Sequence, residues 1–255
     1  MARDLEQYLR PEVGVTFFCP GCGEAILMGL ILRAIDELKV SMDDMLFVSG
    51  IGCASLISSS HFNADTLHTL HGRAIAFATG AKMVNPKLKV MVISGDGDLA
   101  DIGGNHLIHA ARRNTDIAVI CANNMNYGMT GGQVSSTTPF GAFTTTTAQG
   151  NPYHPFDLCR LVKAAGAVHV ARYSVTQPFA VINSIKKVLQ AQGFSFIEIL
   201  TPCPTQFGRR NQFDAPADML KLLMDKCIMK EDAEGLSSEE LSDKIITGEF
   251  TNGGD

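Results

Sequence analysis

Residues 89–98 read KVMVISGDGD and residues 117–124 read IAVICANN, and these two stretches decide the fold. Each begins with a short apolar run rich in β-branched residues, which is typical of a buried strand. Similar runs occur at Met45–Ser49 (MLFVS) and Phe194–Leu200 (FSFIEIL). Segments with helical periodicity alternate with these runs, at Glu24–Leu38, Arg73–Met83, Gly103–Arg113, Phe156–Ala165 and Gln177–Gln190. The alternation predicts an α/β fold with a doubly wound, mostly parallel sheet.

The composition excludes several classes of protein. The chain has 255 residues, of which 45% are hydrophobic, and a formal net charge of −5, which is typical of a globular protein. A nucleic-acid-binding protein would normally carry a basic patch, so nucleic acid is not an expected partner. No apolar run approaches the ~20 residues that span a bilayer, and the N-terminus lacks the pattern of a signal peptide. We therefore expect a cytoplasmic protein without membrane contact, whose seven cysteines are free thiols or metal thiolates.

The pattern of strands and helices weakens towards the C-terminus. We expect one domain over residues 1–213 that binds the cofactors, followed by a C-terminal helix and polar tail over 214–255. Within that second part, 217–229 could form one helix, and 230–255 is polar and charged, so we expect a partner to order it. Residues 135–155 are rich in Thr, Gly and Pro and predict a long functional loop.

Polar residues follow two of the predicted strands directly. Asp96 comes after one strand and Asn124 after the next, with 24 residues (99 to 122) between the two loops. Loops at the carboxyl ends of adjacent parallel strands lie side by side, and ligands bind there. Carboxylate and amide oxygens are ligands that Mg²⁺ prefers, and Gly95 and Gly97 would let backbone N–H groups approach phosphate. The alternative is two ordinary turns that happen to hold Asp and Asn.

Four cysteines are expected at the same edge of the sheet. Cys19 and Cys22 form a C-x-x-C pair before a predicted helix, while Cys53 and Cys203 each follow a predicted strand. Four converging thiolates match the ligands of a 4Fe–4S cluster, although the same four could hold zinc. The neighbouring cofactor site favours iron–sulfur. The remaining cysteines, Cys121, Cys159 and Cys227, are interpreted as small apolar residues.

Two histidines and an arginine precede the second predicted helix. His68, His71 and Arg73 belong to the segment HTLHGR. His71 could act in proton transfer beside the cofactor, or it could make a structural hydrogen bond. Arg73 could contact phosphate or substrate, or it could be a solvated residue at a helix start.

These motifs resemble a known family. Gly-Asp-Gly followed two dozen residues later by Asn-Asn resembles the thiamine-diphosphate signature, in which Asp96, Asn124 and the main chain of Asn126 would bind the metal. From about residue 10 to 213, the chain is similar to the thiamine-diphosphate-binding β subunit of 2-oxoacid:ferredoxin oxidoreductases. The motifs that stand in family order are CPGCG (19–23), GIGC (50–53), HTLHGR (68–73), GDGD (95–98) and TGGQ (130–133). Residues 202–211 (PCPTQFGRRN) most resemble the 2-oxoglutarate branch.

The resemblance implies a set of cofactors and partners. Thiamine diphosphate, Mg²⁺ and the 4Fe–4S cluster would be the cofactors, and the reaction would be the coenzyme A-dependent oxidative decarboxylation of a 2-oxoacid. An α subunit with the pyrimidine-binding domain would supply the Glu that activates thiamine, in an (αβ)2 assembly that reduces ferredoxin. The chain alone would therefore be inactive. Further clusters, if any, would belong to other chains.

Site residues follow from the same resemblance. His71 and Arg73 are the catalytic candidates, and Cys19, Cys22, Cys53 and Cys203 are the cluster ligands. The remaining candidates would bind the cofactor: Gly50, Ile51, Gly52, His68, Gly95, Asp96, Gly97, Asp98, Asn124, Asn126, Tyr127, Gly128, Met129 and Thr130. Two alternatives stay open, namely a non-redox thiamine-diphosphate-dependent 2-oxoacid decarboxylase subunit and a zinc-binding structural subunit. An iron assay on anaerobically purified protein separates them from the main interpretation.

Overall fold

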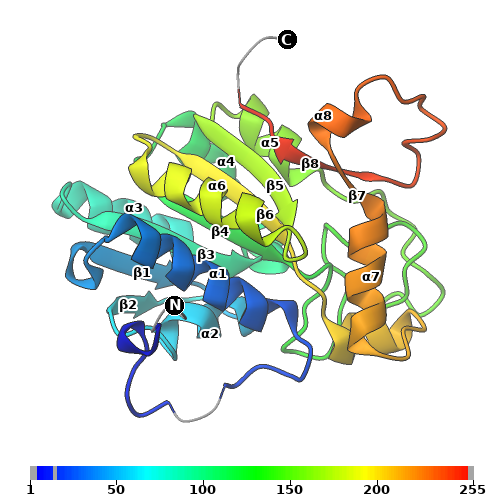
Figure 1. Cartoon of the computed structure of the whole chain (residues 1–255), viewed down its shortest axis with the longest axis horizontal. Coiled ribbons are helices and arrows are strands. Elements are labelled where there is room, and N and C mark those ends of the chain that lie inside the picture. The colour runs from blue at the N-terminus through cyan, green and yellow to red at the C-terminus, as the bar shows by residue number, and fades with distance from the viewer. Residues whose placement is uncertain (1–4, 14–15, 252–255) are drawn as a thin grey trace.

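The computed structural model describes residues 5–13 and 16–251, and it has a central sheet with helices on both faces (Figure 1). The strands lie in the order β2-β1-β3-β4-β6-β5-β8-β7. All neighbouring pairs are parallel except β5 and β8, which are antiparallel. The predicted α/β class with a doubly wound, mostly parallel sheet is confirmed.

The elements follow each other in the expected alternation. The strands are β1 (Met45–Ser49), β2 (Asp65–His68), β3 (Lys89–Gly95), β4 (Ala118–Asn123), β5 (His169–Ser174), β6 (Ser195–Leu200), β7 (Cys227–Met229) and β8 (Ile245–Glu249). The helices are α1 (Gly23–Leu38), α2 (Leu56–Ser59), α3 (Ala74–Val84), α4 (Gly104–Arg112), α5 (Leu158–Ala164), α6 (Pro178–Gln190), α7 (Pro216–Lys226) and α8 (Lys230–Ala233). The four strands expected from apolar runs all form, within one or two residues of the predicted bounds.

Each central strand contributes side chains to two hydrophobic cores because successive side chains point to opposite faces of a sheet. On β3, Met91 and Ile93 pack in the core under α1 and α6, while Val90 and Val92 pack in the core under α3, α4 and α5. All four side chains are at most 4% exposed. The continuous apolar run of this strand is therefore explained by burial on both faces.

Four strands, β2, β5, β7 and β8, were not expected, and β7 lies within the segment predicted as a helix. β2 is half exposed at one edge of the sheet, and β5 carries Arg172 in its middle. β8 pairs antiparallel with β5, where Arg172 lies opposite Gly248. Residues 245–249 thus belong to the sheet of this chain, and the expectation that a partner orders the tail stays a prediction. Residues 252–255, the end of the expected tail, lie outside the described residues.

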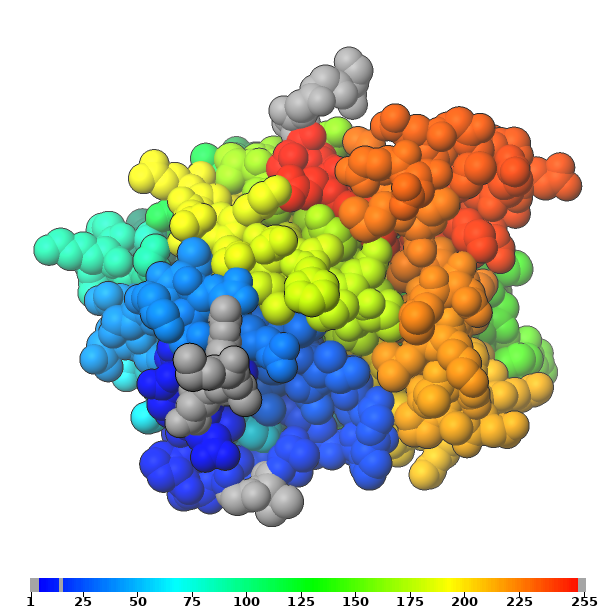
Figure 2. All heavy atoms as spheres, viewed as in Figure 1, coloured from blue at the N-terminus to red at the C-terminus, as the bar shows by residue number. Residues whose placement is uncertain are grey.

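The C-terminal segment packs on one side of the sheet. Figure 2 shows this end of the chain, in orange to red, lying against the body of the molecule beside α6. The predicted helix over 217–229 corresponds to α7, which begins at Pro216 and ends at Lys226. The division of the chain at residue 213 stays a prediction. Among the described residues, no helix is both long and apolar enough to cross a membrane.

The parallel register brings the functional loops together. Gly95 at the end of β3 pairs with Ala122 of β4, and Asn123 pairs with Leu200 of β6. The loops that follow β1, β3, β4 and β6 therefore leave the sheet at one edge, as expected for ligand-binding loops of a parallel sheet.

Candidate functional site

A cleft at the carboxyl edge of the sheet collects most of the predicted cofactor residues. We call it the central cleft. Its lining includes Glu24, Cys53, Ala54, His71 and these predicted residues: Ile51, Gly52, Gly95, Asp96, Gly97, Asp98, Asn124, Asn126, Tyr127, Gly128, Met129 and Thr130. Gly50, His68 and Arg73 are not among its lining residues. The structure thus brings together twelve of the fourteen predicted cofactor residues and one of the two catalytic candidates.

Asp96 lies at the base of the cleft and is held as a hydrogen-bond acceptor. It is 1% exposed, and its Oδ2 accepts hydrogen bonds from Ser135 Oγ at 2.6 Å and Thr137 Oγ1 at 2.5 Å. Burial raises the pKa of Asp96 to about 6, against the lowering effect of the hydrogen bonds from Ser135 and Thr137. A divalent cation in the cleft would favour the charged carboxylate, so the donor set fits Mg²⁺.

The turn after β4 presents oxygen atoms beside Asp96. The backbone N–H of Asn124 lies 3.4 Å from Asp96 Oδ1, which places the two predicted metal ligands side by side. Asn124 Oδ1 accepts from the backbone N–H of Asn126 at 3.2 Å, and Met125 between them adopts a left-handed φ of 65°. Asn126 Oδ1 is buried without a hydrogen-bond partner. Asn126 lines the central cleft, so a group bound there would give this orphaned side-chain oxygen a partner, separately from the main-chain oxygen of Asn126 that is predicted to bind the metal.

Close packing explains one glycine of the GDGD motif. A Cβ at Gly97 would lie 2.6 Å from the ring of Tyr127. The Tyr127 hydroxyl donates to Gly97 O at 3.1 Å or to Asp101 Oδ2 at 2.8 Å. Tyr127 therefore covers the loop after β3, and only glycine leaves room for its ring.

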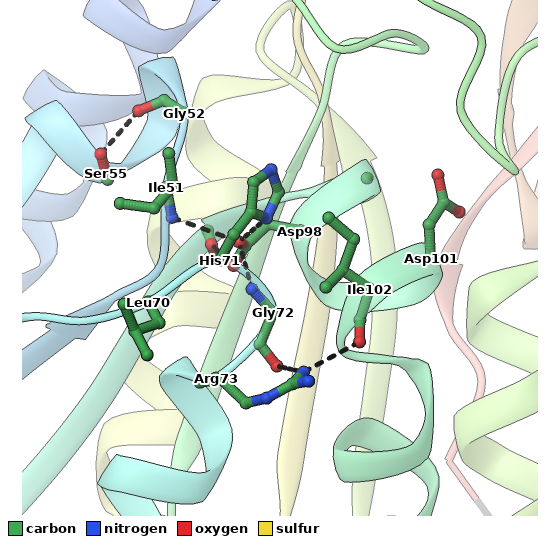
Figure 3. Close-up of polar contacts among 12 residues, drawn as sticks. Ile51, Gly52, Ser55, Leu70, His71, Gly72, Arg73, Asp98, Asp101 and Ile102 are labelled. Carbon is green, nitrogen blue, oxygen red and sulfur yellow. Dashed lines mark hydrogen bonds and ion pairs between the residues drawn. The ribbon is translucent and has the colours of Figure 1, made fainter.

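Asp98 ties three loops together (Figure 3). Its Oδ1 accepts from the backbone N–H groups of Ile51 at 3.2 Å and Gly72 at 2.7 Å, and its Oδ2 accepts from Ser94 Oγ at 2.5 Å. His71 Nδ1 lies 2.5 Å from Asp98 Oδ1. Asp98 is 2% exposed, and its carboxylate already contacts four groups of the protein. A contact with the cofactor, as predicted, would come in addition to these four.

The two catalytic candidates lie in different places. His71 faces the cleft, with its ring 5.8 Å from the ring of Tyr127. Arg73 points away, because its Nη1 donates to the carbonyls of Gly72 and Ile102, each at 3.1 Å (Figure 3). Arg73 thus joins the start of α3 to the segment before α4, whereas its role in catalysis stays a prediction.

His68 and Gly50 support the cleft from outside. His68 Nδ1 and Ser49 Oγ are 3.0 Å apart and form a hydrogen bond between β2 and β1. A Cβ at Gly50 would overlap the carboxylate of Asp98. Gly50 therefore allows the loop after β1 to approach Asp98 closely.

A second cavity holds all four predicted cluster ligands. Cys19, Cys22, Cys53 and Cys203 line a space of about 180 Å³, together with apolar residues such as Phe17 and Phe18. We call it the cysteine cavity. All four cysteines are free thiols. Burial is the largest cause that raises the pKa of Cys53 to about 12, and the neighbouring Glu24 and Cys203 also raise it. Thiolates at this position would need positive charge beside them, which the iron of a cluster supplies.

Glycines allow the cysteine loops to meet. Gly23 N donates to Pro202 O at 2.9 Å, which holds the start of α1 against the loop that carries Cys203. A Cβ at Gly23 would overlap Pro202. Gly21 has a φ of +78°, in the left-handed region, and lies against Pro216. The glycines of the CPGCG motif are therefore required by the close approach of Pro202 and Pro216, which lie 179 positions after Gly23 and 195 positions after Gly21.

The four thiols surround a space and do not converge on a point. Within residues 5–13 and 16–251, no group of three or more His, Cys, Asp or Glu side chains is close enough to hold a single metal ion. A zinc ion requires Zn–S distances of ~2.3 Å to all four sulfurs. A 4Fe–4S cluster binds each thiolate to a different iron atom and fits a wider arrangement.

Glu24 is a residue of the site that sequence reasoning missed. It is 1% exposed and borders both the central cleft and the cysteine cavity. Its Oε1 accepts from Asn124 Nδ2 at 3.1 Å, while its buried Oε2 has no hydrogen-bond partner. Burial raises the pKa of Glu24 to about 8. The signal was its place in the first turn of the helix, directly after CPGCG, but its burial follows only from the folded structure.

Ser135 and Thr137 were also missed as individual residues. The Thr-rich segment 135–155 was expected to be a functional loop, and its first residues supply both hydroxyl donors to Asp96. Their distance from Asp96 along the chain, 39 and 41 residues, left no local pattern to identify them.

Known proteins match this chain over its whole length. The family model "Thiamine pyrophosphate enzyme, C-terminal TPP binding domain" matches residues 50–199. The 2-oxoglutarate synthase subunit KorB of Methanocaldococcus jannaschii is 50% identical over 244 residues, which cover 96% of this chain and 90% of that protein. The β subunit of the 2-oxoacid:ferredoxin oxidoreductase of Saccharolobus solfataricus is 40% identical over 191 residues, covering 74% of this chain and 62% of that subunit.

A solved structure is similar as well. It is described as the 2-oxoglutarate:ferredoxin oxidoreductase from Magnetococcus marinus with 2-oxoglutarate, coenzyme A and succinyl-CoA bound. It matches with a TM-score of 0.85 and 30% sequence identity, over 100% of this chain and 86% of the other.

Proposed function

The chain belongs to the β subunits of the 2-oxoacid:ferredoxin oxidoreductases, on the 2-oxoglutarate branch, and from this premise we propose how its residues serve the reaction. Together with an α subunit, it catalyses the coenzyme A-dependent oxidative decarboxylation of 2-oxoglutarate. The reaction converts 2-oxoglutarate and coenzyme A to succinyl-CoA, carbon dioxide, one proton and two electrons, and an acceptor such as ferredoxin takes the electrons. The non-redox decarboxylase and the zinc-binding subunit find no support among these relatives.

One observation carries the proposal. The central cleft and the cysteine cavity share a wall that is formed by Glu24, Cys53, Asn124, Gly128 and Met129. An oxygen-rich cation site therefore lies directly beside four thiols. When bound, thiamine diphosphate supplies the ring carbon at which a 2-oxoacid loses carbon dioxide, and the cluster supplies a one-electron acceptor.

The proposed Mg²⁺ ligands are Asp96 Oδ1, Asn124 Oδ1 and the main-chain oxygen of Asn126. Ser135 and Thr137 hold the other oxygen of Asp96, and Glu24 holds the amide nitrogen of Asn124. These three contacts involve neither Asp96 Oδ1 nor Asn124 Oδ1, the two side-chain atoms proposed to bind Mg²⁺. Such outer contacts orient ligands and strengthen metal binding.

The remaining roles are proposed on the same basis. Cys19, Cys22, Cys53 and Cys203 hold the 4Fe–4S cluster, and the loops 50–52, 95–98 and 126–130 surround the diphosphate. His71 contacts the cofactor or a proton in transit, with Asp98 as its partner. The α subunit supplies the Glu that activates the pyrimidine ring, in an (αβ)2 assembly located in the cytoplasm.

The test is anaerobic co-purification of this chain with its α subunit. We expect four iron atoms per cluster bound by the four cysteines, stoichiometric thiamine diphosphate, and reduction of viologen dye that requires both 2-oxoglutarate and coenzyme A. A panel of 2-oxoacids identifies the substrate. No dye reduction with any 2-oxoacid, or zinc in place of iron, would contradict the proposal.

A further inference from the structure

A buried charge pair lies behind the central cleft, in neighbouring strands of the sheet. Glu198 on β6 is 2% exposed, and its Oε2 accepts from Arg172 Nε at 2.7 Å. The two residues are register partners in β5 and β6. Arg172 also donates from Nη2 to Asp157 Oδ1 at 2.6 Å. Neither Glu198 nor Arg172 lines the central cleft, and the proposed function uses neither.

The second oxygen of Glu198 reaches the residue before the metal-binding turn. Glu198 Oε1 accepts from Asn123 Nδ2 at 2.7 Å. A carboxylate oxygen can only accept hydrogen bonds, so the side-chain amide of Asn123 must present its nitrogen to Glu198. The amide oxygen of Asn123 then faces the other way. Glu198 therefore selects one of the two orientations that an amide could take.

The Asn123 oxygen is used by two groups of the cation site. Asn123 Oδ1 accepts from Met125 N at 3.0 Å, and it lies 3.0 Å from Thr137 Oγ1, whose single proton is shared between Asn123 Oδ1 and Asp96 Oδ2. The first bond closes the turn in which Met125 has its left-handed φ of 65°. Thr137 Oγ1 lies 2.5 Å from Asp96 Oδ2. If the Asn123 amide flipped, its nitrogen would face the backbone N–H of Met125. That N–H group would then lose its hydrogen-bond acceptor.

We propose that Glu198, held by Arg172, is a positioning residue for Mg²⁺, because it fixes the Asn123 amide that shapes the turn carrying Asn124 and Asn126. This inference rests on the proposed function, which assigns Asp96, Asn124 and Asn126 to the metal. Glu198 touches neither metal nor cofactor and acts only through Asn123. Glu198 therefore supports the metal site from outside the ligand set, through hydrogen bonds that run from Arg172 to Glu198 and from Glu198 to Asn123.

The test uses the anaerobically purified complex with its α subunit, freed of Mg²⁺ by chelation. Calorimetry of thiamine diphosphate binding at a series of Mg²⁺ concentrations gives the half-saturating Mg²⁺ concentration. Glu198→Gln allows the amide to flip, because glutamine has both a donor and an acceptor end. We expect this variant to need about 10-fold more Mg²⁺ or higher, the effect typical of outer contacts.

A reciprocal exchange separates positioning from general stability. Asn123→Asp places two carboxylates face to face and should also weaken Mg²⁺ binding. In the double variant N123D/E198Q, glutamine donates to one oxygen of the new aspartate, and the other oxygen accepts from Met125 N. We expect the double variant to recover to within about 3-fold of the wild type, since the coupling of two contacting residues is non-additive.

Val170→Ala provides the matched control. Val170 lies on β5 and is fully buried at 0% exposure, so its truncation lowers the melting temperature without touching Asn123. We expect it to bind Mg²⁺ as the wild type does. A wild-type complex that binds no thiamine diphosphate refutes the proposed function, whatever the variants do.

Three outcomes overturn the inference alone. They are wild-type Mg²⁺ dependence of Glu198→Gln, a double variant no better than the single variants, and a Val170→Ala variant that loses Mg²⁺ affinity in parallel with its stability. If Glu198→Gln does not assemble, Asn123→Asp and the double variant decide by the same readout. A double variant that fails to fold also counts against the inference, because it keeps the charge and the donor–acceptor pair.

Discussion

Asp96 is a buried carboxylate whose orientation in the proposed cation site is set by hydrogen-bond donors around it. Two hydroxyl groups and one backbone N–H surround it, and its solvent exposure is 1%. Removing a charged group from water is costly unless opposite charge compensates it. The raised pKa of Asp96, about 6, reflects this cost before any cation is bound.

Asp96→Asn should weaken the cation site more than any change around it. The amide keeps the size of the side chain, but it lacks the charge that attracts Mg²⁺ and loses an acceptor for Ser135 or Thr137. We expect the half-saturating Mg²⁺ concentration for thiamine diphosphate binding to rise at least about tenfold. The exposed Asp65 provides the control, since Asp65→Asn changes the net charge equally and should leave binding unchanged. Equal binding by both variants would contradict the assignment.

At the scale of elements, the start of α1 decides whether the cysteine cavity forms. The helix begins at Gly23, directly after Cys22, and its first N–H group bonds to Pro202 next to Cys203. One backbone contact therefore joins the segments that carry the proposed cluster ligands Cys22 and Cys203.

Gly23→Ala should break that contact, because the added Cβ would overlap Pro202. We expect the free energy of unfolding to fall by about 1–3 kcal/mol, as for other overpacked sites, and the iron content of anaerobically purified complex to drop. Gly29→Ala in the same helix is the matched control, since a Cβ there meets nothing within 4 Å. That change should stabilise the chain by about 0.5–1 kcal/mol with full iron content. Full iron in Gly23→Ala would show that this spacing is not needed.

The contact between β5 and α6 makes stability depend on pH. His169, at the start of β5, is 8% exposed, and its Nε2 lies 3.5 Å from Ser184 Oγ on α6. Burial lowers the pKa of His169 below its usual 6.5. The unfolded chain therefore binds the proton more readily than the folded chain, so stability is present above pH 6.5 and declines as pH falls through the folded pKa.

His169→Gln removes this titration. We expect the melting temperature of the variant to decline less than that of the wild type between neutral pH and about pH 5, where an ordinary histidine becomes charged. Chemical denaturation at several pH values measures the same difference. Parallel curves for variant and wild type would rule out His169 as the cause.

On the scale of the whole molecule, the last strand covers the charge pair behind the cleft. Phe250 directly follows β8, and the guanidinium of Arg172 lies 5.6 Å from the centre of its ring. Phe250 N also donates to Val170 O at 2.7 Å, which fixes the end of the chain on β5. Residues near the C-terminus thus shield a salt bridge at the centre of the sheet.

Phe250→Ala should reduce the stability of the complete chain by about 1–3 kcal/mol, through lost apolar burial and the lost cation–π contact. The comparison is Phe179→Ala on α6, where the side chain is 82% exposed and little burial is lost. Denaturant titration of both variants measures the difference. Equal stabilities would mean that the C-terminal strand does not shield the sheet.

The sequence by itself determined the central strands and the family, and it predicted residues for both parts of the site. The strands β1, β3, β4 and β6 are buried on both faces, so their apolar runs are local and visible along the chain. Asp96 and Asn124 were identified because each directly follows such a strand. Cys53 and Cys203 were identified for the same reason and Cys19 and Cys22 as a C-x-x-C pair, and the structure brings all four to one cavity.

Only the tertiary structure decided which polar residues are buried and where their side chains point. Glu24, Ser135 and Thr137 join the site through contacts with distant segments, and Arg73 points away from the central cleft because carbonyl groups of Gly72 and Ile102 accept its hydrogen bonds. β5 was missed because Arg172 interrupts its apolar pattern, and its burial depends on Glu198 in the next strand. Hydrophobic periodicity is a local property of the chain, whereas the burial of a charge depends on a partner that only folding supplies.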